Sequence, residues 1–168
     1  MLIQQKIGNV NLNPTNKNID WLQLEWHETS KRILHKKTCS GVNISLKFMG
    51  ENQQLTQGDI LWANAESLIV VDILLCEAII IEPKNMAEMA SVCYEIGNKH
   101  LPLFYQENKL LVPFEQPLFK LLSAAKYDLK VEKQKLLNQL KTTVSPHGNT
   151  QSNGTLFSKI MQLTSPKE

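Results

Sequence analysis

Arginine is almost missing from this 168-residue sequence. Arg32 is the single arginine, lysines supply the other positive side chains, and the formal net charge is only +2. Planar guanidinium groups are the preferred partners of phosphates, and a charge this small gives little long-range attraction to nucleic acid. The composition therefore argues against a nucleic-acid-binding protein.

Cysteines and long apolar runs are also scarce. Cys39, Cys76 and Cys93 lie far apart and form no Cys-x-x-Cys motif, so they indicate neither a disulfide framework nor a zinc knuckle. No apolar run approaches the roughly 20 residues of a membrane span. The start, MLIQQKIGNV, lacks the apolar core of a signal peptide. We therefore expect a soluble cytoplasmic protein that has reduced thiols and is not associated with a membrane.

Catalytic motifs are missing as well. The sequence contains no P-loop, no glycine-rich phosphate cradle and no Ser/His/Asp order. Glu115 and Asp128 have no second carboxylate at catalytic spacing. We predict that the protein is not an enzyme and has no catalytic residues.

The pattern that is present is α+β, and it changes near the middle of the chain. Over residues 1–75, short segments that cluster or alternate β-branched and aromatic residues are separated by turn signals such as Ser40-Gly41. This spacing predicts a small all-β domain, either a barrel or a sandwich. The six predicted strands lie in LIQQKIGNVNL, LQLEW, RILHKKT, VNISLKF, GDILWAN and SLIVVDILL.

Residues 76–141 have a different rhythm. The segment CEAIIIEP predicts a buried strand that stops at Pro83, and Asn85 with Glu88 three residues later predicts the start of a capped helix. Gly97 is expected to take the left-handed conformation that ends this helix. The predicted apolar face of the helix consists of Met86, Met89, Ala90, Cys93 and either Ile96 or Gly97.

The remainder of this half completes a known motif. LPLFYQ and KLLVPF predict a hairpin that turns at Glu107-Asn108, FEQPLFKLLSAAK predicts a second helix, and YDLKVEK predicts a last strand. The order β-α-β-β-α-β is that of a ferredoxin-like domain. The predicted inner face of the second helix consists of Leu118, Leu121, Leu122 and Ala125.

The periodicity weakens after Val131. KQKLLNQLK is interpreted as a short helix. Residues 142–168 are predicted to be a mobile tail, because TTVSPHGNTQSNGT is polar and rich in Pro, Gly, Asn and Ser. LFSKIMQL has helical spacing but is too short to be stable alone. It could dock on the body of the protein or fold against a partner.

Four histidines are the candidates for metal chemistry. His100 directly follows the first predicted helix, where the simplest explanation is a favourable interaction with the helix dipole. His27 and His35 stand among charged residues and are expected to be solvated. For His147, in the tail, an unattached side chain remains a full alternative to a ligand.

CYEIGNKHLPLFY followed by FEQPLFKLL resembles the C-terminal half of the UreE family, the nickel metallochaperones of urease maturation. The family is marked by a Gly-Asn-Arg-His stretch that closes the first helix of a ferredoxin-like domain. This chain has Gly97-Asn98-Lys99-His100 in that place. LEWHETSKR, LTQGDILW and VSPHGN extend the resemblance from Met1 to about Gly148, and it is strongest to members from Helicobacter-type bacteria.

The resemblance implies a homodimer that binds nickel. By this resemblance, the two copies of His100 meet across the dimer interface on one ion, His147 supplies a further ligand from the tail, and zinc is a second metal. Two departures matter: Lys99 lacks the fork of the usual arginine, and Glu95 stands where many members have another histidine. Because the tail has only His147, we expect few ions per dimer.

The resemblance also implies the role and the partners. The protein would deliver nickel for assembly of the urease active site, and its partners would be the maturation GTPase UreG and the urease pre-activation complex. Two alternatives stay open: a metal-independent protein-binding scaffold in a maturation complex, and an RNA-binding protein. RNA-recognition modules need aromatic residues on their central strands. CEAIIIEP has none and KLLVPF has only Phe114, so the RNA alternative ranks last.

Overall fold

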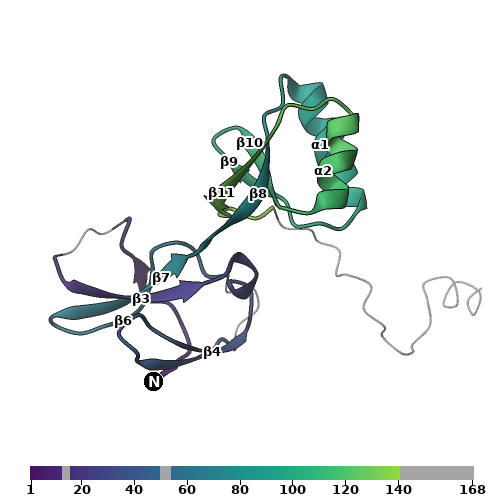
Figure 1. The fold of residues 1–168 in the computed structure, drawn as a ribbon. Coiled ribbons are helices and arrows are strands. Elements are labelled where there is room, and N and C mark those ends of the chain that lie inside the picture. Colours follow the sequence, from purple (N-terminus) through teal and green to yellow (C-terminus); the bar gives the residue numbers. More distant parts are fainter. Residues whose placement is uncertain (13–15, 50–53, 141–168) are drawn as a thin grey trace, which may run out of the picture.

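The computed structural model describes residues 1–12, 16–49 and 54–140. It has two lobes, which meet where β7 (Ser67–Ile73) runs almost directly into β8 (Leu75–Ile81) (Figure 1). The N-terminal lobe holds β1 to β7, and the C-terminal lobe holds β8 to β11 with both α-helices. The predicted α+β class is therefore confirmed. The segment predicted to be a mobile tail, 142–168, lies outside the described residues.

The N-terminal lobe is built from two sheets. One has the strand order β2-β6-β7-β3 with β3 and β7 parallel, and the other has the order β1-β5-β4. LIQQKIGNVNL was predicted as one strand, and this is wrong, because β1 and β2 join different sheets. The strands are β1 (Leu2–Ile3), β2 (Gly8–Asn9), β3 (Asn18–Leu24), β4 (Ile33–Lys37), β5 (Asn43–Lys47) and β6 (Asp59–Ala63).

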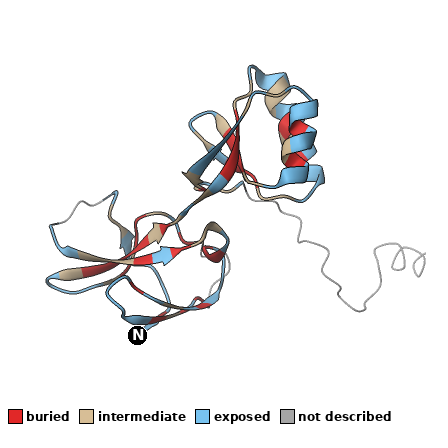
Figure 2. Cartoon of the chain, viewed as in Figure 1, coloured by how far each residue is buried: buried red, intermediate tan, exposed pale blue. Residues whose placement is uncertain are grey.

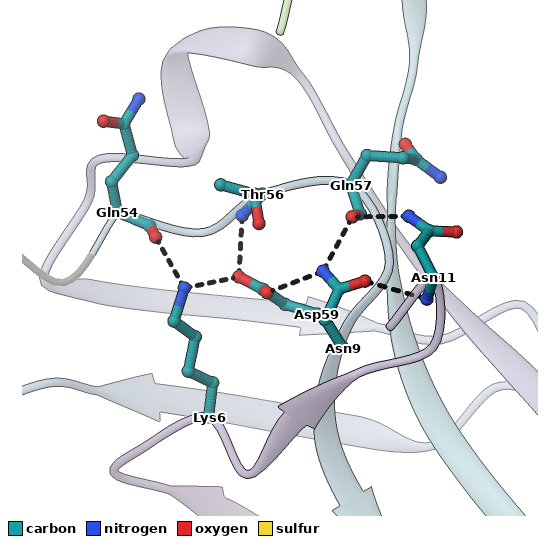
Figure 3. Close-up of polar contacts among 7 residues, drawn as sticks. All are labelled: Lys6, Asn9, Asn11, Gln54, Thr56, Gln57 and Asp59. Carbon is teal, nitrogen blue, oxygen red and sulfur yellow. Dashed lines mark hydrogen bonds and ion pairs between the residues drawn. The ribbon is translucent and has the colours of Figure 1, made fainter. Parts of the chain in front are cut away.

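Short strands of this kind need more than pairing to fix their ends, and a buried carboxylate contributes here. Asp59 is only 3% exposed. It accepts hydrogen bonds from Lys6 Nζ at 2.9 Å, Asn9 Nδ2 at 3.0 Å and the Thr56 backbone N–H at 2.8 Å (Figure 3). Because a buried charge must be paired and hydrogen-bonded, this network ties the N-terminal segment to the loop before β6.

The C-terminal lobe has the predicted ferredoxin-like topology. Its antiparallel sheet has the order β11-β8-β10-β9, which places the first and third strands of the βαββαβ unit in the centre. Both helices cover the same face of this sheet (Figure 1). The remaining elements are α1 (Met86–Asn98), β9 (Phe104–Gln106), β10 (Lys109–Pro113), α2 (Gln116–Ala124) and β11 (Leu129–Lys135).

Two local predictions in this lobe are confirmed. The Asn85 side chain caps α1 by accepting from the Glu88 N–H at 2.9 Å, and the Glu88 carboxylate accepts from the Lys84 N–H at 2.7 Å. The hairpin between β9 and β10 turns at Glu107 and Asn108, whose φ angles are 50° and 63°. Two successive positive φ angles define the turn that matches the twist of a two-residue hairpin.

The apolar faces of the helices differ in part from the prediction. Val92 and Ile96 are fully buried, but Met86 is 82% exposed and Leu121 is 38% exposed. In α1 the contacts with the core begin one turn later than predicted, at Met89. Ala90 and Ala125 are also exposed, so the predicted faces are wrong at these four positions. Figure 2 shows the buried residues on the sheet and on the inner side of the helices.

The short helix predicted in KQKLLNQLK is also wrong. β11 continues to Lys135, which pairs with Leu75. Leu136 then becomes buried, with 2% exposure, and Gln139 forms an isolated bridge with Phe104. Strand pairing and burial of an apolar side chain against the sheet outweigh the weak local preference for a helix.

Side chains from both lobes meet on the sheet face that the helices leave open. Trp26, in the short 3-10 helix Trp26–Glu28, packs edge-on against Phe104 with ring centroids 5.7 Å apart. Lys135 Nζ lies 2.5 Å from the Asp72 carboxylate. Burial raises the pKa of Asp72, but hydrogen bonds from Lys135 and Gln57 outweigh it and hold that pKa below its usual value.

Candidate metal centre

The backbone at the end of α1 places His100 in an unusual conformation. The helix includes Gly97 and ends at Asn98, and Lys99 still has helical dihedral angles. His100 has a φ of 54°, in the left-handed region. The prediction that Gly97 takes the left-handed conformation is therefore wrong, because the histidine itself takes it three residues later.

Hydrogen bonds and one apolar contact fix this helix end. The His100 N–H donates to the Gly97 carbonyl at 3.0 Å, and the Leu101 N–H donates to the Ile96 carbonyl at 3.5 Å. This pair of bonds is the Schellman arrangement, which usually has glycine at the left-handed position. Leu101 packs against the same core cluster as Ile96, which completes the arrangement. The direction in which the His100 side chain leaves the backbone is thus set by the fold.

A side chain at this position is unfavourable. Left-handed backbone costs a residue with a Cβ atom about 1 kcal/mol relative to glycine. The same conformation occurs at Lys126, which follows α2, so the strained backbone fixes the direction of the His100 side chain but does not by itself mark a functional site. The surroundings are open to a ligand, because Asn98, Lys99 and His100 are all exposed.

One protomer does not supply a complete metal site within the described ranges. No group of three or more His, Cys, Asp or Glu residues there is arranged to hold a metal ion. His100 is the only predicted ligand among the described residues, since His147 lies outside them. A site built on His100 therefore needs ligands from elsewhere, such as a second protomer or the segment after Leu140.

Two other histidines make contacts of their own, in agreement with a non-ligand role. The His27 ring packs edge-on against Trp26 with centroids 5.3 Å apart. His35 Nδ1 lies 2.9 Å from Ser45 Oγ on the neighbouring strand. Both histidines belong to the N-terminal lobe, apart from the helix end that carries His100.

Sequence reasoning missed an exposed apolar surface on α1. Met86 is 82% exposed and Tyr94 is 70% exposed. The aromatic Tyr94, outside the predicted apolar face, was the signal that could have indicated it. Both side chains are open to contact with another protein molecule. None of the helices in the described part of the chain is long and apolar enough to cross a membrane.

Comparison with known proteins assigns both lobes. The profile of the UreE urease accessory protein N-terminal domain matches residues 3–74, and that of the UreE C-terminal domain matches residues 73–153. Urease accessory protein UreE of Flavobacterium johnsoniae is 46% identical over 149 residues, which cover 89% of this chain and 90% of that protein. The UreE protein of Helicobacter pylori strain P12 is 40% identical over 88% of this chain and 89% of its own length. The UreE protein of Actinobacillus pleuropneumoniae is 35% identical over 76% of this chain and 68% of its own length.

These matches confirm the family predicted from the GNKH stretch and its flanking segments. They also confirm that the protein is an accessory chaperone and not an enzyme. This chain belongs to the UreE family of urease accessory proteins and has a role in urease maturation.

Proposed function

We propose that this protein binds nickel and delivers it for assembly of the urease active site. The observation that carries the proposal is the strained helix end, which holds the His100 imidazole at an exposed position where glycine is usual. In a two-fold homodimer the same residue is supplied twice. Two copies of His100 would then provide two nitrogen ligands to one ion, which is the cargo of the protein.

The chemistry of this ligand set suits a carrier. Neutral imidazole binds nickel well, and nickel stands high in the affinity order of divalent metals. Two imidazoles leave coordination positions open, and His147 is the proposed further ligand. Open or exchangeable positions allow the ion to be passed on, whereas a closed shell favours a structural site. Zinc fits the same ligands and is the proposed second metal.

The exposed apolar side chains of α1 supply a surface for the proposed dimer. Met86 and Tyr94 would be covered by the second copy, in keeping with the aromatic and methionine enrichment of interfaces. We assign metal binding and dimerisation to residues 76–141, partner binding to 1–75, and the tail to 142–168. The proposed partners are the GTPase UreG and the urease pre-activation complex, and the proposed location is the cytoplasm.

Nickel calorimetry at neutral pH tests the proposal directly. We expect about one tightly bound ion per dimer, loss of tight binding in His100→Ala, and a loss of up to about a hundredfold in His147→Ala. The contribution of His147 is smaller because closing the tail on the metal costs conformational entropy. His35→Ala is the matched control, since it removes an exposed histidine of the N-terminal lobe. Unchanged binding in His100→Ala would overturn the mechanism.

Two further measurements sharpen the test. Light scattering should show a dimer without metal, because the site needs both copies of His100 in place. Nickel affinity should fall steeply as the pH drops through about 6.5, because ligating imidazoles must be neutral and protons compete with the metal. A wild-type protein that takes up no nickel but still joins a maturation complex would instead be the metal-independent scaffold.

A further inference from the structure

One sheet of the N-terminal lobe has a face that is open to solvent. In β1, β4 and β5, more and less buried residues alternate, and the buried set, which includes Ile3, Leu34 and Leu46, belongs to the apolar core of the lobe. The other side chains therefore point away from that core. We name this surface the basic face, and it consists of Leu2, Ile33, His35, Lys37, Asn43, Ser45 and Lys47.

The formal charges on the basic face are all positive. None of its three strands contains Asp or Glu, whereas each of the other two sheets does, for example Asp72 in β7 and Glu77 in β8. Within residues 1–12, 16–49 and 54–140, the side chains of Lys37 and Lys47 make no ion pair. The basic face thus carries two exposed cations that the described part of the chain does not neutralise.

Protection of a sheet edge explains only part of this pattern. Lysines on edge strands discourage pairing between sheets of different molecules, and β4 is an edge strand in the order β1-β5-β4. Lys47 lies on β5, the central strand, where no edge needs protection. Its partner in register is Ile33, which is 61% exposed, and Leu2 is 60% exposed on the other side of β5. The basic face therefore combines unpaired cations with two large apolar side chains that are open to contact.

The size and place of the basic face fit one segment of a partner. Five residues of a strand span about 17 Å and three neighbouring strands span roughly 10 Å, an area far below the roughly 800 Å² that each side of a standard interface buries. Contact through this face is therefore expected to be weak and transient. β4 lies apart from α1 and α2, so a partner bound there leaves the end of α1 open (Figure 1).

We propose that the basic face is a docking surface for an acidic segment of a protein partner. Carboxylates of that segment would lie over Lys37 and Lys47, and an apolar side chain would contact Ile33 and Leu2. This inference rests on the partner binding proposed for residues 1–75, to which it gives a place and a chemistry. Complementary charges speed association and fix the register, and the apolar contacts add affinity that salt does not screen.

The composition of the basic face favours a protein over a nucleic acid. The face has no aromatic side chain on which an unpaired base could stack. Two lysines neutralise few phosphates, and a phosphate backbone offers no apolar group to Leu2 and Ile33. An acidic protein segment supplies both kinds of contact.

Fluorescence anisotropy of a labelled synthetic peptide, titrated with the full chain in about 0.1 M salt, tests the proposal. The peptide has glutamates on both sides of two leucines, and the control peptide has glutamine in place of every glutamate. Wild type should bind only the acidic peptide. Lys37→Glu combined with Lys47→Glu should weaken this binding about tenfold or more, because two attractions become repulsions.

Matched variants separate the basic face from net charge alone. Lys120→Glu combined with Lys133→Glu changes the net charge equally at exposed lysines of the C-terminal lobe. It should alter the affinity by less than about twofold, because charges more than about 10 Å away are screened at this salt. Ile33→Thr should weaken binding about two- to fivefold, since apolar contact is lost. Val131→Thr, at a valine of β11 that is 41% exposed, should have no effect.

The outcomes separate this inference from the proposed nickel delivery. Equal losses in the two lysine pairs, equal binding of the two peptides, or no binding by wild type would each overturn the inference. Tighter binding of a single-stranded DNA oligonucleotide through Lys37 and Lys47 would overturn it as well. Nickel calorimetry on the variant of the basic face should match wild type. If wild type bound the acidic peptide but no nickel, the nickel proposal alone would fail.

Discussion

The two lobes differ in whether their polar side chains are buried. Among the described residues, the buried polar side chains are Glu28, Thr29, Thr38 and Asp59, and all four belong to the N-terminal lobe. The core of the C-terminal lobe is built from hydrophobic residues such as Ile79, Ile81 and Leu122. Its candidate metal ligand, His100, lies at the surface at the end of α1.

The difference shows which polar groups are engaged in internal hydrogen bonds and which are open to an external ligand. The Glu28 carboxylate accepts from Lys36 and from the Glu25 N–H, so it is engaged in holding the frame together, as Asp59 is. In the C-terminal lobe the helices and strands satisfy most of their own backbone groups, and the Asn85 side chain that caps α1 is exposed. This leaves the imidazole of His100 available to a ligand from outside the protomer.

The largest expected effect comes from removing the buried carboxylate of Asp59 in the N-terminal lobe. Asp59→Ala should lower the free energy of unfolding by roughly 3 kcal/mol, because three donors lose a buried ionic acceptor. Urea denaturation followed by tryptophan fluorescence reports on this lobe, which holds Trp21, Trp26 and Trp62, and circular dichroism of α1 and α2 reports on the C-terminal lobe. Glu88→Ala, which removes an exposed acceptor of the C-terminal lobe, should cost less than about 1 kcal/mol. Equal losses in the two variants would contradict the comparison.

A second substitution distinguishes the backbone strain at His100 from the proposed role of its side chain in nickel binding. His100→Gly should raise the free energy of unfolding by about 1 kcal/mol, because glycine takes the left-handed conformation without strain. The same variant should lose tight nickel binding. Thermal unfolding and nickel calorimetry on one sample measure both effects. A variant that is less stable than wild type would mean that the imidazole makes a stabilising contact.

The ion pair between the lobes gives a smaller effect that depends on pH. Asp72→Asn should cost about 1 kcal/mol at neutral pH, because the 2.5 Å pair with Lys135 is lost. The folded-state pKa of Asp72 lies below its unfolded value of 3.8, so this stabilisation is present above about pH 5 and disappears as the pH falls through the folded value. In denaturation experiments from pH 6 to pH 3, the free energies of unfolding of wild type and Asp72→Asn should converge as the pH falls. A constant difference over that range would rule out the ionic origin.

The smallest effect concerns Gly97. Gly97→Ala should stabilise the protein by roughly 0.5 kcal/mol, because the residue is helical and a Cβ atom placed there meets no other atom within 4 Å. Nickel affinity should not change if the dimer leaves this position uncovered. A loss of stability in the monomeric fold would restore the interpretation of Gly97 as the left-handed residue.

The sequence by itself determined the elements whose signals are local. Asn85 with Glu88 marks a helix start through a side-chain cap, and Glu107-Asn108 marks a two-residue turn, because both depend on atoms only a few residues apart. The order β-α-β-β-α-β followed from such signals and so did the ferredoxin-like topology. His100 was found as a candidate ligand through the GNKH stretch and its resemblance, and its role in metal binding stays a prediction.

Tertiary structure alone decided the features that depend on distant contacts. The left-handed residue is His100 and not Gly97, because the helix ends where Leu101 can pack onto the core beside Ile96. Residues 136–140 follow β9 instead of forming a helix. The reason is that Leu136 packs in an apolar cluster and the Leu140 N–H donates a hydrogen bond to the Leu103 carbonyl. Neither the burial of Leu101 nor the edge of β9 is visible in local periodicity, which records propensity but not the partner that overrides it.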